Sequence, residues 1–143
     1  MLFRLVESIT PLYRIKIRAP EELRGGYRRK VRTLCLGNLR GGDTFSIICP
    51  PSNYTIHSNQ LTFEDKDEAE RFAEKAVGKF ADYGTEYYIS RVRREIGPLI
   101  RVRTEFGEAG VSAEYINYIR NSFKAKDYSA AILSDEPEAD FRG

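Results

Sequence analysis

A strict alternation near the N-terminus is the feature that most constrains how this chain can fold. In the stretch PLYRIKIRAP, apolar side chains alternate with basic ones: Tyr13, Ile15 and Ile17 against Arg14, Lys16 and Arg18. Successive side chains of a β-strand point to opposite faces. The pattern therefore predicts a strand over residues 13–18 with one face in the core and one basic face.

The next stretch, GGYRRKVRTLCLG (residues 25–37), is predicted to return beside that strand. Pro20 and the Gly25–Gly26 pair indicate a loop before it, so a hairpin with a long loop fits the spacing. Its first half is basic, whereas Leu34, Cys35 and Leu36 are apolar. The alternation is imperfect, and either a bulge or a change of burial along the strand explains it.

Short strands are also expected over the following thirty residues. NLRGGD indicates a turn, and TFSIIC is an apolar strand that ends at Pro50–Pro51. NYTIHS and QLTF resemble the two arms of a hairpin joined through Ser58–Asn59. No segment before residue 64 has the periodicity of a helix.

Two segments have helical periodicity. Over residues 64–83 the apolar side chains recur at helical spacing, with Asp65 as N-cap, Glu68 as the reciprocal half of a capping box and Gly84 as the stop. Residues 112–126 form the second predicted helix, with Ser112 as N-cap.

Residues 86–106 are ambiguous. Gly97–Pro98 would end a helix over 86–96, but the Tyr, Ile and Val content favours a strand there. We expect two strands that turn at Gly97–Pro98, with the helix as the alternative. The resulting fold class is α+β: a largely antiparallel β-sheet with two amphipathic helices packed on one face. We expect a single domain over residues 1–134, with a strand-rich basic half over 1–63, and a flexible acidic tail over 135–143.

Composition is that of a globular chain, with 41% hydrophobic residues among 143. No apolar run approaches the roughly 20 residues of a membrane span, so no membrane association is expected. Two cysteines, Cys35 and Cys49, are too few for a disulfide scaffold and are expected to be buried thiols, although a bridge is possible if their strands are neighbours. These features favour a cytoplasmic location.

The sequence lacks the patterns of common catalytic sites. His57 is the only histidine, and no GxSxG motif or recognisable metal-ligand spacing accompanies it. The pairs Gly25–Gly26 and Gly41–Gly42 are not followed by the Lys-Ser/Thr of a phosphate-binding loop. We therefore predict a non-enzymatic protein with no cofactor and no metal.

Charge is unevenly distributed along the chain. Residues 1–63 carry ten Lys or Arg against four Asp or Glu, whereas residues 64–83 carry four against seven. Basic side chains bind phosphates, and tyrosines offer stacking surfaces for bases. The predicted function is non-catalytic binding of DNA or RNA through a basic sheet face, with the acidic helix on the opposite side. The predicted nucleic-acid-binding residues are Arg14, Lys16, Arg18, Arg28, Arg29, Lys30, Arg32, Arg91, Arg93, Arg101, Arg103, Tyr13 and Tyr27.

Two other interpretations of the basic face are open. Tyr and Arg are also favoured at protein interfaces, so a small adaptor, inhibitor or assembly subunit that binds an acidic protein is the alternative function. An ordinary solvated sheet face gives the same pattern, and pairing with Glu95 or Glu105 would neutralise part of it.

Overall fold

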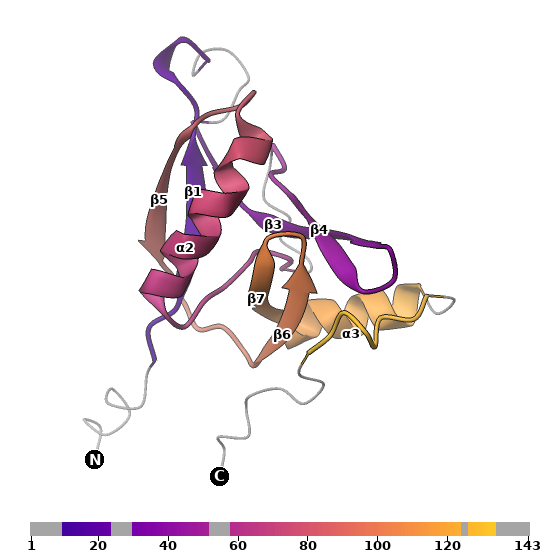
Figure 1. Ribbon diagram of the computed structural model, residues 1–143. Coiled ribbons are helices and arrows are strands. Elements are labelled where there is room, and N and C mark those ends of the chain that lie inside the picture. Colours follow the sequence, from indigo (N-terminus) through magenta and orange to yellow (C-terminus); the bar gives the residue numbers. More distant parts are fainter. Residues whose placement is uncertain (1–9, 24–29, 52–57, 124–125, 134–143) are drawn as a thin grey trace, which may run out of the picture.

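The computed structural model describes residues 10–23, 30–51, 58–123 and 126–133 (Figure 1). Within these ranges the α+β class predicted from the sequence is confirmed. The elements in chain order are β1 (Tyr13–Arg18), the 3₁₀ turn η1 (Glu21–Leu23), β2 (Val31–Thr33), β3 (Cys35–Arg40), β4 (Thr44–Ile48), α2 (Lys66–Ala76), the 3₁₀ turn η2 (Val77–Phe80), β5 (Glu86–Arg91), β6 (Leu99–Thr104), β7 (Gly107–Ser112) and α3 (Ala113–Ser122).

The strands divide into two sheets, where the sequence predicted one. The first sheet has the order β2-β1-β5 and the second has the order β3-β4-β6-β7. Neighbouring strands are antiparallel except for β4 and β6, which are parallel. Only Leu34 separates β2 from β3, so one run of chain passes from the first sheet into the second.

This crossing explains the irregular alternation of residues 25–37. Leu34, Cys35 and Leu36 are consecutive and all fully buried, at 0%, 1% and 0% exposure. A strand within a single sheet with one solvated face would bury only every second side chain. A change of burial at the passage between sheets therefore accounts for the pattern, and the shift of register in β3 lies further along, between Leu36 and Leu39.

A short segment, residues 59–63, joins the two sheets, and we call it the linking segment. Phe63 exchanges backbone hydrogen bonds with Tyr13 of β1, and Thr62 does the same with Gly110 of β7. Leu61 N donates to the carbonyl of Leu34, at the crossing between β2 and β3. The linking segment thus forms backbone hydrogen bonds with a strand of each sheet and with the residue at which the chain crosses between the sheets.

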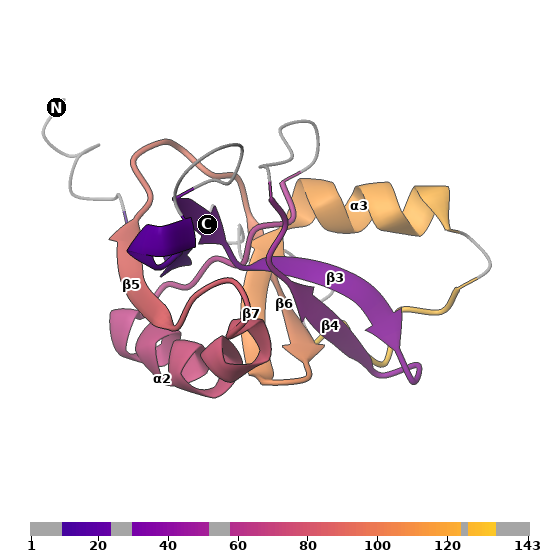
Figure 2. The ribbon, with the colours of Figure 1, turned by 90° about the horizontal axis from the view of Figure 1, so that it is seen from above.

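Each helix covers a different sheet (Figures 1 and 2). The helix α2 lies over β1 and β5, and it buries an apolar stripe that includes Phe72. The ring of Phe72 packs against Phe63 of the linking segment, with 5.3 Å between ring centroids. The helix α3 lies beside β6 and β7 and buries Ile116 and Ile119.

The helix starts follow the sequence, because each N-cap side chain bonds a backbone N–H of the first turn. Asp65 Oδ1 accepts from Asp67 N and Ser112 Oγ accepts from Glu114 N, each at 3.1 Å. Glu68 was expected to form the second half of a capping box. Its carboxylate instead accepts hydrogen bonds from Arg101, with which it forms an ion pair.

The ambiguity over residues 86–96 is resolved as a strand, because β5 covers residues 86–91. It does not pair with β6, however: β5 pairs with β1, whereas β6 pairs with β4 and β7. Strand β7 was not expected from its sequence, GEAGVS. Most of the expected hairpin arm NYTIHS and the whole tail 135–143 lie outside the described residues.

In the part of the chain that the structure describes, no helix combines the length and the apolar character needed to cross a membrane.

Gly110 tests the contact between β7 and the linking segment. A Cβ at this position would lie 2.5 Å from the carbonyl oxygen of Thr62. We expect Gly110→Ala to lower the free energy of unfolding by about 1–3 kcal/mol, the usual cost of such overpacking, measured by urea denaturation. Gly78→Ala is the matched control, because its Cβ would meet nothing within 4 Å. Equal stability of the two variants would contradict the importance of this contact.

Candidate anion-binding site

The basic face predicted for β1 is formed by Arg14, Lys16 and Arg18. The intervening Ile15 and Ile17 have no exposed surface and lie in the core. In the pairing with β5, Arg14 stands opposite Ser90, Lys16 opposite Tyr88 and Arg18 opposite Glu86. Directly opposed residues of an antiparallel pair share a face. The polar face of the first sheet therefore includes these residues of both strands.

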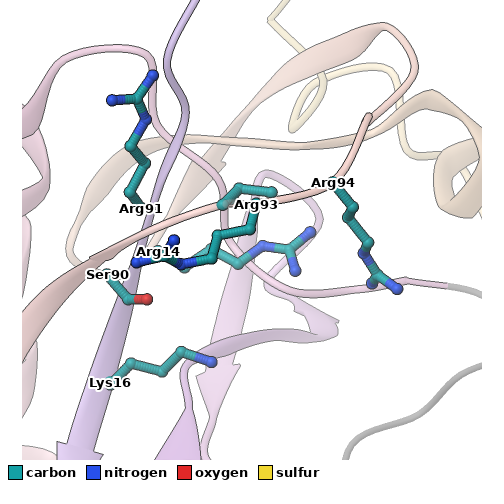
Figure 3. Close-up of a pocket in the computed structure, with 7 residues that line it drawn as sticks. Arg14, Lys16, Ser90, Arg91, Arg93 and Arg94 are labelled. Atoms are coloured by element: carbon teal, nitrogen blue, oxygen red, sulfur yellow. The ribbon is translucent and has the colours of Figure 1, made fainter.

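A pocket of about 250 Å³ lies at one end of this face. Arg14 and Lys16 of β1 line it together with Ser90 and Arg91 at the end of β5 and residues 92–94 that follow β5. Figure 3 shows the side chains of Arg14, Lys16, Arg93 and Arg94 gathered there, whereas that of Arg91 points away. Five cationic residues and no carboxylate line the pocket.

Arg14 is the most unusual residue of the pocket, because its charged side chain is only 7% exposed and has no acidic partner among the described residues. Its Nε donates to Thr62 Oγ1 at 3.3 Å, and its Nη1 donates to Gln60 Oε1. Its Nη2 is buried and has no hydrogen-bond partner within the described ranges. The linking segment therefore orients the guanidinium with two neutral acceptors and leaves its charge uncompensated.

The electrostatics of the pocket reflect this missing counter-charge. Burial, followed by repulsion from Arg94, lowers the pKa of Arg14 to about 10, with a smaller opposite effect from Cys35. Burial and then Arg14 also lower the pKa of Lys16, whose Nζ donates to Thr33 Oγ1 at 2.7 Å. A buried charge without a partner costs several kcal/mol. An anion in this pocket would offset that cost.

Other cationic side chains of the protein form ion pairs with acidic residues. The ion pairs found within the described residues join Arg101 to Glu68 and Glu108, and join Arg40 and Lys79 to Glu105. Arg101 of β6 is one of the predicted binding residues, and its two ion pairs neutralise its charge. None of the cations that line the pocket takes part in an ion pair among those residues.

The other predicted site residues lie elsewhere. Arg32 is opposite Ile17, so it shares the core-side face of the sheet. Its guanidinium stacks over the ring of Tyr83 at 3.8 Å, and Nη1 donates to the Cys49 carbonyl. Tyr13 also lies on the face opposite Arg14 and packs against the core. Arg103 is exposed on β6, in the second sheet.

The basic segment before β2 contributes little to the described site. Lys30 is exposed, and its carbonyl accepts a hydrogen bond from Ala19 N. Tyr27, Arg28 and Arg29 lie outside the described residues. The structure therefore places Arg14, Lys16, Arg91 and Arg93 around one pocket and Arg18 further along the same face of β1. It separates these residues from Arg32, Arg101, Arg103 and Tyr13.

Some residues of the site were not found from the sequence. Arg94 adjoins two predicted arginines in the run RVRR, so its position beside them was a usable signal. Tyr88, in contrast, is one of the tyrosines that the sequence offers as a stacking surface. It is 39% exposed on the basic face, and the Arg18 guanidinium lies 5.2 Å from its ring centroid. Gln60 and Thr62 gave no signal, because neutral side chains in a short segment do not reveal which buried cation they orient.

The thiols next to the pocket are poor nucleophiles. Cys35 and Cys49 are free, and Cys35 Sγ donates to the Thr33 carbonyl at 3.4 Å. Burial, with a contribution from Cys49, raises the pKa of Cys35 to about 12, and burial raises that of Cys49 to about 11. Among residues whose placement is described, no group of three or more His, Cys, Asp or Glu is arranged to hold a metal ion.

Comparisons with protein-family models, with curated proteins and with solved structures each give no match to this chain.

Arg14 and Arg94 face the same pocket but should affect stability differently. We expect Arg14→Gln to raise the free energy of unfolding by about 1–2 kcal/mol, because removal of the buried charge outweighs the loss of a donor to Gln60 and Thr62. Arg94→Gln should leave it within about 0.5 kcal/mol of the wild type or raise it, because the substitution removes a repulsion at an exposed position. Urea denaturation of both variants measures the difference. A loss of stability in Arg14→Gln would contradict the cost of its buried charge, and a loss in Arg94→Gln would contradict the repulsive role of Arg94.

The raised pKa of Cys35 predicts a specific alkaline instability. Above its ordinary pKa of 9.0 the unfolded thiol ionises, whereas the folded thiol retains its proton until about pH 12. The stabilisation is complete below pH 9 and is lost as the pH rises. Between about pH 8 and pH 10, the wild type should lose roughly 1 kcal/mol more than Cys35→Ala. Parallel pH profiles of the two proteins in urea denaturation would refute the shift.

Proposed function

We propose that this protein binds nucleic acid without catalysing a reaction, through the pocket and the adjoining polar face of β1 and β5. The observation that carries the proposal is the buried guanidinium of Arg14, which forms no ion pair with a carboxylate among the described residues. Folding has already desolvated this charge, so a phosphate that enters the pocket gains a strong interaction without the full cost of desolvating the arginine.

The surroundings of Arg14 support a phosphate as the ligand. Arg93 and Arg94 are exposed at the rim, so their side chains can adjust to a ligand within nanoseconds. Guanidinium groups bind phosphate oxygens through paired N–H donors, which gives geometric selectivity as well as charge. Four arginines and one lysine around a single pocket are well suited to this chemistry.

The face beside the pocket supports a nucleic acid rather than an isolated anion. Arg18 and Tyr88 lie on the same face of the first sheet as Arg14 and Lys16. An exposed tyrosine ring can stack with a base, and the adjacent guanidinium can contact a further phosphate. A carboxylate-rich protein would use the cations but would gain less from the stacking surface.

Salt dependence of binding tests the proposal. Fluorescence anisotropy of labelled single-stranded and duplex DNA and RNA is measured from about 50 to 200 mM salt. Neutralisation of about three phosphates on a single strand gives a log–log slope of about −2, so affinity should fall roughly 20-fold over this range. Polyglutamate serves as competitor for the alternative of an acidic protein partner.

A matched pair of variants locates the binding surface. The double substitution Arg93→Gln, Arg94→Gln should weaken binding to every sequence at least about tenfold and make the salt slope shallower. Arg103→Gln is the control, because it removes an exposed arginine from the other sheet. Absence of salt-sensitive binding, equal effects of the two changes, or displacement by polyglutamate at equal charge would each refute the proposal.

A further inference from the structure

The pocket has the size and the charge of a site for a single phosphate group. Its volume of about 250 Å³ is below the range of about 300–1,000 Å³ that is typical for drug-sized ligands. A phosphate with part of its sugar fits such a volume, whereas a run of stacked bases does not. The pocket therefore has room for one phosphate group and part of its sugar.

The charge of the pocket favours an ester with more than one negative charge. The charges of Arg14 and Arg94 repel each other, and the charge of Arg14 also disfavours the protonated form of Lys16. An internal phosphodiester brings only one negative charge to this group of cations. A terminal phosphate monoester carries about −1.5 to −2 at neutral pH and has three oxygens to accept hydrogen bonds.

The direction of the basic face indicates how the rest of a strand would lie. Arg14, Lys16 and Arg18 follow one another on one face of β1, with a separation of roughly 6–7 Å between neighbours along the strand. This row leads from the pocket to the exposed ring of Tyr88 beside Arg18. An extended single strand can follow it, whereas a duplex cannot place a base on that ring without unpairing.

We infer that the pocket receives the terminal phosphate monoester of a single nucleic-acid strand, which then follows β1 toward Arg18 and Tyr88. This inference rests on the proposed function, since it specifies which part of a nucleic acid occupies the pocket. Arg14 lines the pocket, and its Nη2 has no hydrogen-bond partner among the described residues.

End-group competition tests the inference. One short single strand with an internal fluorophore is prepared with a 5′-phosphate, with a 3′-phosphate and with hydroxyls at both ends. We expect one phosphorylated form to bind at least about tenfold more tightly than the hydroxyl form, a difference typical of a lost charge-assisted contact. Phosphatase treatment of the tighter ligand should abolish the difference in affinity. Inorganic phosphate should weaken binding of the phosphorylated form down to the affinity of the hydroxyl form.

Variants separate recognition of the end from general affinity. Arg14→Lys keeps the charge but removes the fork of N–H donors, so it should lose the preference for the phosphorylated end and still bind the hydroxyl form. Arg94→Gln, which is expected to fold normally, should reduce the preference as well, and Arg103→Gln should not.

The outcomes distinguish this inference from the proposed function. Equal affinity for the two phosphorylated forms, the hydroxyl form and a circularised strand would overturn the terminal-phosphate site while leaving nucleic-acid binding in place. No salt-sensitive binding of any form would overturn both. A preference that survives in Arg14→Lys and Arg94→Gln would place end recognition outside the pocket.

Discussion

The hydrogen bonds of the linking segment are the constraint on which the rest of this structure depends. Residues 59–63 bond to β1 at Tyr13, to the crossing between the sheets at Leu34, and to β7 at Gly110. Small sheets are marginal on their own and gain stability when their faces are packed. Phe63 adds such packing, because it contacts Phe72 of α2. The segment thus unites two small sheets around one core.

The same segment makes Arg14 a candidate ligand-binding residue. Gln60 and Thr62 satisfy two of its donors but supply no negative charge. Arg101 shows the opposite arrangement, since Glu68 and Glu108 both pair with it. Among the described residues, acidic side chains therefore neutralise Arg101, and none pairs with Arg14. Structural stabilisation explains Arg101 completely, whereas it leaves the charge of Arg14 unexplained.

Local patterns were predictable from the sequence, but the partners of each strand were not. Alternation identified β1, and the caps Asp65 and Ser112 marked the starts of α2 and α3. Strand β7 was missed because Gly107 and Gly110 are poor strand formers, although Gly110 is required for the close approach of Thr62. Alternation places Arg101 and Arg103 on one face of their strand, but it could not show that β6 belongs to another sheet, so they were grouped with the basic residues of the first sheet.

The two faces of the first sheet differ in charge, and this difference gives a binding surface its direction. On the α2 side, burial together with Glu74 and Glu70 of the helix raises the pKa of Tyr87, which shows that negative charge lies near that face. On the other face, the positive charges of Arg14 and Lys16 repel each other. The residues that line the pocket include no carboxylate. A polyanion is repelled from the helix side and attracted to the pocket side. The core side chains of β1 separate these two fields, so the alternation that builds the sheet also separates its acidic side from its basic side.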